Sequence, residues 1–296
     1  MTPRSYRLLL MRPEFFAILS SMGWAVDAVL VRRGARFSSV SAAAFLSFLV
    51  TAVCLWSAIA YFFSFQQLRS LGVVYFIVGG LLQPLLARLL YYGGITRLGV
   101  ARADPLRRIS PLFAIFVAVL FLGERPSSFV YGGTVLIVIG ACFVLARKGE
   151  EREWRILDAA FPLGSAFVAA VSQNVRRTGL LILPNPLIGA AVTTSTSLIV
   201  LFIFVLFTGK IGLIRPHRAS MPFFGITAFI SAGSQFLAFI ALNQGEVSVI
   251  APILSMTPFF SVFLSAFFLR DLERVTSKIV MGVLLLVTGV TLITTR

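Results

Sequence analysis

Residues 110–140 read SPLFAIFVAVLFLGERPSSFVYGGTVLIVIG, and this stretch decides the fold class. Two apolar runs flank the short polar turn GERPSS at residues 123–128. Together with the residues that flank the stretch, the runs extend over about 100–122 and 129–145, close to the length of about 20 residues that a membrane-spanning helix needs. Both runs are continuously apolar, whereas the strands of a membrane β-barrel alternate apolar and polar residues. The stretch therefore predicts two transmembrane helices joined by a tight turn.

The composition extends this prediction to the whole chain. Of its 296 residues, 58% are hydrophobic and only 12% are charged, against about 25% charged residues in soluble proteins. A soluble fold of this length cannot bury so much apolar surface. The net charge of +15 does not indicate nucleic-acid binding, because Lys and Arg lie mainly at the ends of apolar runs, where they meet lipid headgroups. The predicted partner is therefore the lipid bilayer and not a nucleic acid.

Hydropathy and helix breakers predict an all-α integral membrane protein with ten transmembrane helices. The charged run RKGEERE at residues 147–153 is the clearest linker. It separates a first repeat, residues 1–149, from a second repeat, residues 150–296. The expected helices are 14–31, 41–63, 73–96, 100–122, 129–145, 157–174, 186–207, 222–242, 247–269 and 279–293.

The two halves resemble each other in the order of their markers. Two prolines six residues apart occur in both, as do two glycines seven residues apart and a Val-Arg-Arg triplet. Because five helices is an odd number, tandem copies enter the membrane from opposite sides and form two inverted five-helix repeats. Secondary transporters are often built in this way, with the substrate site near the membrane midplane. The matched markers are Pro105/Pro111 with Pro252/Pro258, Gly133/Gly140 with Gly282/Gly289, and residues 31–33 with 175–177.

The stretch from Ser110 through the Leu122-Gly123-Glu124 turn to Gly140 resembles the signature of the EamA family of the drug/metabolite transporter superfamily. The second half is similar but degenerate, with Glu273 at the position of Glu124. The resemblance implies a secondary carrier without ATP hydrolysis, enzymatic activity or cofactor, in the cell (inner/cytoplasmic) membrane. Members of the superfamily carry amino acids, sugars, nucleotide-linked metabolites and drugs, so the resemblance does not narrow the substrate.

Arg88 is the sharpest candidate for substrate binding. It lies deep in the third expected helix, four residues after Pro84, with Tyr91 and Tyr92 on the same face. A charged side chain inside a bilayer is costly and indicates function, here the binding of a carboxylate or phosphate. The alternatives are a structural ion pair with Asp27 or Asp104, or extension of the side chain to the interface. The repeat aligns Arg88 with Gln235, which predicts that both approach the pseudo-axis.

Further charged residues open the fourth expected helix and follow Trp24 in the first. Asp104 and Arg108 have the spacing and order of a favourable helix pair, which leaves Arg107 without an obvious partner. This cluster, which also includes Arg102, either contacts substrate or anchors the helix at the interface. Asp27 is a proton-coupling carboxylate, the counter-charge of Arg88 or Arg32, or a residue near the lipid–water boundary. Trp24 is available to stack on a ring or a cation.

Other polar and small residues have structural interpretations. Glu124 is expected to cap a helix or pair between helices, and residues 173–174 and 243–244 to be polar helix ends. The two-glycine helices predict close packing or a homodimer face. No spacing of Cys, His or acidic residues predicts a metal site.

The orientation evidence conflicts. The resemblance implies cytoplasmic termini, but that arrangement leaves eight Lys and Arg on cytoplasmic segments and seventeen on the opposite ones, with Arg88 omitted. The positive-inside rule then favours the reverse orientation.

Four to five arginines at candidate cavity positions, against two acids, predict that the substrate is an anionic or zwitterionic metabolite. The alternatives are a flippase for a polyprenyl-phosphate-linked sugar and a drug-type cation exporter. The substrate, coupling ion, transport direction and oligomeric state are not predicted.

Overall fold

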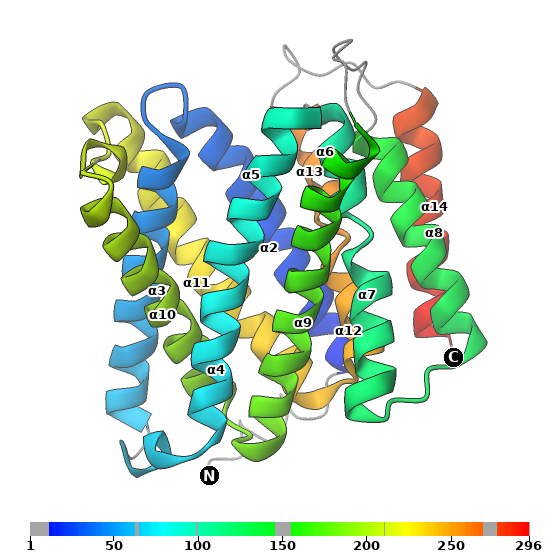
Figure 1. The fold of residues 1–296 in the computed structure, drawn as a ribbon, viewed down its shortest axis with the longest axis horizontal. Coiled ribbons are helices and arrows are strands. Elements are labelled where there is room, and N and C mark those ends of the chain that lie inside the picture. The colour runs from blue at the N-terminus through cyan, green and yellow to red at the C-terminus, as the bar shows by residue number, and fades with distance from the viewer. Residues whose placement is uncertain are drawn as a thin grey trace.

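The computed structural model describes residues 12–62, 65–98, 100–145, 155–209, 211–268 and 277–295. All regular secondary structure in these ranges is helical (Figure 1). The first half contains α2 (Pro13–Gly34), α3 (Val40–Phe62), α4 (Gly72–Leu81), α5 (Ala87–Leu98), α6 (Val100–Arg107), α7 (Ser110–Val117) and α8 (Ser128–Leu145). The second half contains α9 (Ala160–Ile182), α10 (Pro186–Phe207), α11 (Met221–Gln244), α12 (Val247–Leu254), α13 (Thr257–Phe268) and α14 (Ser277–Thr294).

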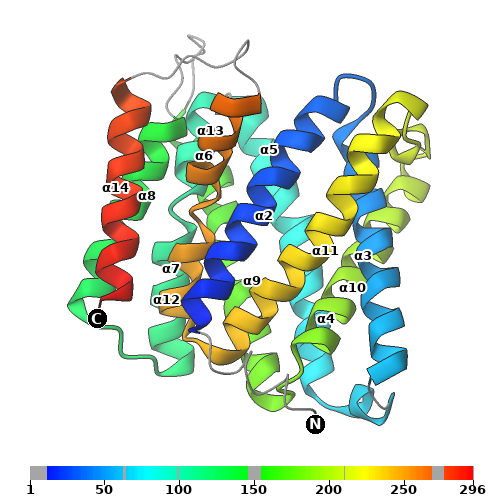
Figure 2. The same cartoon turned by 180° about the vertical axis from the view of Figure 1, so that it is seen from behind.

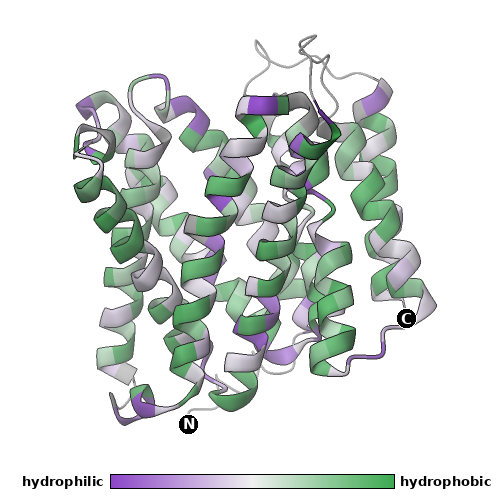
Figure 3. Cartoon of the chain, viewed as in Figure 1, coloured by the Kyte–Doolittle hydropathy of each residue, from purple (hydrophilic) through white to green (hydrophobic). Residues whose placement is uncertain are grey.

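Six helices are long and apolar enough to cross a membrane, and four shorter apolar helices accompany them within the described ranges. Figure 3 shows apolar residues along the flanks of the bundle, with hydrophilic residues mainly at its two ends and at a few positions along the helices. The expected all-helical membrane fold is therefore correct. The predicted linker at residues 147–153 and Glu273 lie outside the described residues.

One predicted boundary is wrong. The sixth expected helix ends at residue 174, but α9 continues to Ile182. Gln173 and Asn174 are therefore not at a helix end: Asn174 is 3% exposed and donates hydrogen bonds to the carbonyls of Ala114 and Ala170. Two arginines interrupt the apolar run, but the helix continues through them. The apolar run resumes at residues 179–183 (GLLIL).

The fourth and ninth expected helices are each interrupted at residues 108–109 and 255–256 (Figure 2). Pro111 and Pro258 explain both breaks, because proline lacks the N–H that would bond four residues back and disfavours helical geometry in the preceding residue. Discontinuous helices are a common feature of transporter sites. The third expected helix is continuous, but α4 and α5 join through a π-helical segment, Leu82–Leu86, that contains Pro84.

Helices of one half pack mainly against helices of the other. α2 lies against α11, α9 against α4 and α5, α3 against α10, and α8 against α14. In Figures 1 and 2, α2 begins at the end of the bundle where α14 finishes, whereas α9 begins at the opposite end. The first helices of the two halves, α2 and α9, therefore run antiparallel to each other.

Two pairs of equivalent contacts relate the halves. The Ser20 hydroxyl donates to the Ser234 carbonyl at 2.8 Å, and the Ser165 hydroxyl donates to the Ala87 carbonyl at 2.6 Å. Gly34 packs against Phe224 as Gly179 packs against Phe76. In both pairs, a residue of α2 is equivalent to the residue of α9 that lies 145 positions later in the sequence. The Val-Arg-Arg match, at a spacing of 144, is thus one residue out of register, and Arg176 lies opposite Val31.

The glycines of α8 and α14 lie in contact with each other. A Cβ added to Gly133 would lie 2.5 Å from the carbonyl oxygen of Gly289, and one added to Gly140 would lie 2.7 Å from that of Gly282. Backbones approach this closely only where side chains are absent. These glycines therefore allow close packing of α8 and α14 within the chain, which is the first of the two predicted roles; the second was a homodimer face.

Glu124 caps a helix of the opposite half. Its two carboxylate oxygens accept hydrogen bonds from the backbone N–H groups of Val247 and Ser248, each at 2.8 Å, at the start of α12. Beside it, Arg177 donates to the carbonyls of Leu242 and Asn243 at the end of α11, at 2.6 and 2.8 Å. The predicted capping role of Glu124 is correct, and its helix is α12.

We expect Glu124→Ala to lower the free energy of unfolding by about 1–2 kcal/mol, the usual effect of removing an N-cap. Glu124→Gln, which keeps one acceptor oxygen, should lose about half as much. The thermal midpoint of the purified protein in detergent measures both. Arg125→Ala, at the exposed neighbouring position, should leave the midpoint unchanged; an equal fall in that control would contradict the capping role.

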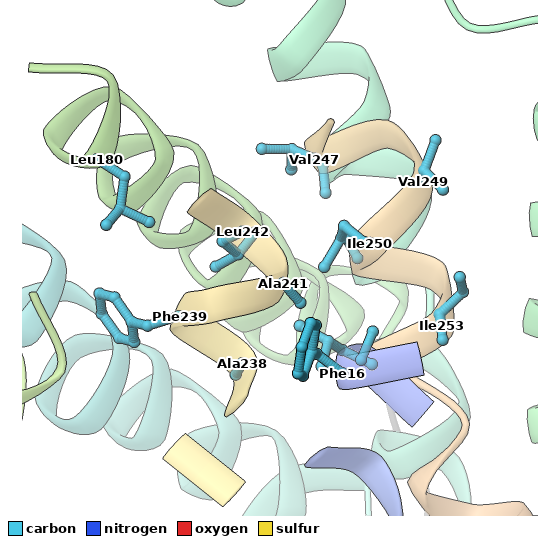
Figure 4. Close-up of a cluster of buried hydrophobic side chains, with 14 of the residues drawn as sticks. Phe16, Leu180, Ala238, Phe239, Ala241, Leu242, Val247, Val249, Ile250 and Ile253 are labelled. Atoms are coloured by element: carbon cyan, nitrogen blue, oxygen red, sulfur yellow. The ribbon is translucent and has the colours of Figure 1, made fainter. Parts of the chain in front are cut away.

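A large apolar core fills the half of the bundle near the start of α2. Figure 4 shows Phe16, Leu180, Phe239, Leu242 and Ile250 converging from α2, α9, α11 and α12. All five side chains are at most 2% exposed. This core closes the bundle at that end.

Candidate functional site

A cavity of about 430 Å³ lies between α2, α3, α5, α6, α9, α10, α11 and the π-helical segment Leu82–Leu86. Its volume is within the range typical of small-molecule sites. On α2 it begins at Trp24, beyond the core residue Phe16, and on α11 it ends at Gln235, before the core residue Ala238. The cavity and the core therefore occupy opposite halves of the bundle. The polar lining consists of Asp27, Ser47, Thr51, Gln83, Arg88, Arg107, Arg176, Thr194, Ser197, Ser231 and Gln235.

The cavity brings together most of the predicted site residues. Arg88, Arg107 and Asp27 line it, and so do the neutral candidates Trp24, Tyr91, Tyr92 and Gln235. Arg108 and Asp104 do not. Arg108, the first residue after α6, lies near Asp104 and near Cys142 of α8. The side chain of Arg102 lies outside the described residues.

Arg107 extends over the ring of Tyr91, with its guanidinium carbon 4.5 Å from the ring centroid. Its neighbours include the like charges of Arg88 and Arg108 and the opposite charge of Asp104. It occupies the last position of α6, immediately before the break in the helix. The discontinuity thus positions this arginine at the cavity, and the aromatic face supports it there.

Arg88 forms no ion pair with a carboxylate in the part of the chain that the structure describes. Asp27, the counter-charge proposed from sequence, likewise has no ion pair among those residues, and the side chain of Ser231 is its hydrogen-bonding neighbour. Its Oδ1 is buried without a hydrogen bond. Arg88 and Asp27 therefore both line the cavity, and they do not form an ion pair with each other.

Arg176 was not predicted as a site residue. Its side chain is 8% exposed and lines the cavity, with Nη2 3.5 Å from the Gly79 carbonyl and the guanidinium 5.7 Å from the Phe239 centroid. Its Nε is buried without a hydrogen-bond partner. The missed signal is the apolar run after residue 178, which indicates that the arginine lies inside a helix rather than after one.

Gln83 was also missed. It lies in the π-helical segment beside Pro84, lines the cavity, and has a buried Oε1 without a partner. π-Helical segments frequently occur at functional sites because they reorient one side chain of a helix. The available sequence signal was the adjacent Pro84, because a proline inside a helix disrupts its hydrogen bonding.

The cavity charge is distributed unevenly between its walls. Its three lining arginines lie on α5, α6 and α9, and its aspartate lies on α2. At the equivalent positions the pseudo-symmetry places Gln235 opposite Arg88, Leu254 opposite Arg107 and Val31 opposite Arg176. The shared fold does not require these cations. In the described ranges, no three His, Cys, Asp or Glu residues cluster as metal ligands do.

A comparison with family models matches the EamA-like transporter family twice, over residues 11–146 and 159–295. The chain belongs to the EamA-like transporter family. This EamA-like chain is accordingly a multi-pass membrane protein of a family of transporters, built on two EamA units. No curated protein matches it. One solved structure, described only as "Crystal structure of protein", is similar with a TM-score of 0.77 and 14% identity, over 95% of this chain and 96% of that chain. That likeness concerns the fold alone.

Proposed function

We propose that this EamA-like protein is a secondary transporter that binds a small anionic or zwitterionic metabolite in the cavity. The supporting observation is the lining of three arginines against one aspartate. Cations held away from water interact strongly with an anion, and arginine matches carboxylate and phosphate oxygens with paired donors. Arg88 and Arg107 are the proposed contacts for the negative group, with Arg176 contributing from α9.

The opposite wall accommodates the remainder of the substrate. Asp27, Ser231 and Gln235 lie on α2 and α11, and Trp24 adds an aromatic face. A zwitterion is bound with its acid toward α5 and α6 and its ammonium toward Asp27. A simple anion leaves Asp27 free for a coupling ion.

The proposed architecture has ten transmembrane helices in two inverted repeats, residues 1–149 and 150–296, in the cell (cytoplasmic) membrane. The antiparallel course of α2 and α9 and the equivalent serine bonds support it. Transport proceeds by alternating access: the core around Phe239 and Leu242 separates to open the second end, and the Glu124 and Arg177 contacts are released with it.

The test is Arg88→Gln. We expect small carboxylates or phosphates to raise the thermal midpoint of the purified protein, because a ligand that binds the folded state stabilises it. Arg88→Gln should weaken that effect at least tenfold in ligand concentration. Arg69→Gln removes the same charge from an exposed position outside the cavity and should leave ligand binding unchanged. Unaltered binding and flux of an identified anion in Arg88→Gln would refute the assignment.

A drug-type cation exporter is the second candidate, and Asp27 beside Trp24 in the cavity favours it. In that case cations and neutral aromatics stabilise the protein, and Asp27→Asn rather than Arg88→Gln removes the effect.

A further inference from the structure

A second, smaller cavity of about 100 Å³ adjoins the first between α3, α5 and α10. Arg88, Tyr92, Phe48 and Ser197 line both cavities. The two spaces therefore meet at the cation that the proposed function assigns to the negative group.

The lining of this side cavity is mostly apolar. Apart from the shared residues and Ser41, it consists of Leu89, Val200, Leu201 and Phe204. Leu89 and Phe204 are also exposed on the outside of the bundle, at 48% and 41%, where a membrane protein meets lipid. The side cavity is thus an apolar space with one cation at its inner end and the lipid-facing flank at its outer end.

The two directions away from Arg88 differ chemically. The main cavity offers Asp27, Ser231 and Gln235, which suit hydrogen-bonding groups. The side cavity offers hydrocarbon, and burying an alkyl group there is favourable by the hydrophobic effect. Polar substituents in that space would lose hydration without gaining partners.

We propose that the side cavity binds the apolar tail of an amphipathic anion, whose acid lies at Arg88 and whose short alkyl or aryl group lies among Leu89, Val200 and Leu201. This inference rests on the proposed function and deepens it: it makes these residues determinants of specificity. The acid end is common to all substrates, and the side cavity discriminates among tails.

The test measures the affinity of unbranched monocarboxylates of two to eight carbons for the full chain in lipid nanodiscs. We expect the dissociation constant to fall about fourfold per methylene, until the cavity is filled. Alcohols with the same alkyl chains should not bind saturably, which separates the site from partition into lipid.

Leu201→Trp fills the side cavity and should abolish the gain with chain length while leaving acetate affinity within about twofold. Val200→Trp should fill the side cavity from the neighbouring position with the same effect. It replaces Leu201→Trp in the experiment if that variant does not fold. Ile203→Trp is the matched control, because Ile203 is 45% exposed on the same helix and lines neither cavity; it should retain the full gain.

The outcomes separate this proposal from the one on which it rests. Acid binding that requires Arg88 but shows no gain with chain length, or a gain that persists in both tryptophan variants, overturns the side-cavity proposal and leaves the anion site intact. Acid binding that is unchanged in Arg88→Gln refutes the anion site itself, and the side-cavity proposal with it. Saturable binding only of lipid phosphates also overturns it and favours a flippase.

Discussion

Gly133→Leu is expected to abolish stable folding or to lower the free energy of unfolding by more than about 3 kcal/mol, beyond the usual cost of overpacking. The added Cβ would lie 2.5 Å from the Gly289 carbonyl oxygen and 2.6 Å from Cγ1 of Ile293. Backbone carbonyls cannot retreat as a flexible side chain can. The two helices must therefore separate along their length, and the neighbouring contact of Gly140 with Gly282 is lost with them. Fluorescence-monitored size exclusion and thermal midpoints in detergent measure the effect.

Gly132 provides the matched control for this substitution. It is the adjacent residue on the same helix, it is exposed, and a Cβ added there meets no atom within 4 Å. Gly132→Leu should therefore leave the midpoint close to that of the native protein. Similar midpoints for the two leucine variants would show that α8 and α14 are not packed through their glycines.

Arg176→Met and Arg177→Met are expected to change stability in opposite directions. Arg176 is buried with one long hydrogen bond and no carboxylate partner among the described residues. Burying a cation costs several kcal/mol, so an apolar side chain of similar length should raise the thermal midpoint. Under the proposed function the same change removes one of three cavity arginines and weakens anion binding at least tenfold.

Arg177 differs because its guanidinium satisfies two carbonyls at the end of α11. Its replacement by methionine leaves those acceptors without a charged donor and should lower the free energy of unfolding by about 1.5–3 kcal/mol. Thermal midpoints of both variants, with and without an anion, provide the measurement. A fall of equal size in the two would mean that Arg176 stabilises the fold, and would remove it from the proposed site.

The membrane fold was predictable from the sequence because the bilayer imposes length and polarity on every spanning helix. The grouping of Arg88, Gln235, Asp27 and Trp24 was predictable for a related reason. Charged and amide side chains inside a membrane must turn toward the bundle interior, and the repeat brings equivalent positions near one axis. The glycine contacts and the Glu124 cap followed from the same reasoning about small and capping residues.

Arg176 was not predictable in the same way, because two adjacent arginines have the appearance of a helix end in a hydropathy reading. Only the tertiary packing against Gly79 and Phe239 shows that one of them is buried. The Val-Arg-Arg match was wrong for a similar reason: it pairs identical residues at a spacing of 144, whereas equivalent contacts made by α2 and α9 have a spacing of 145. Because both arginines lie inside α9, neither is a loop charge of the kind that the positive-inside rule counts.

The contact between α8 and α14 also has a mechanical consequence. Two helices whose backbones touch at successive glycines cannot roll or slide on each other, because any displacement brings a side chain into a space that holds none. We expect this pair to be the stationary frame of the molecule, with one member from each half. Under the proposed alternating-access function, the rearrangement takes place in the eight predicted spans outside this pair. Distances across the α8–α14 pair are then expected to stay constant through a transport cycle, while those between α2 and α9 change.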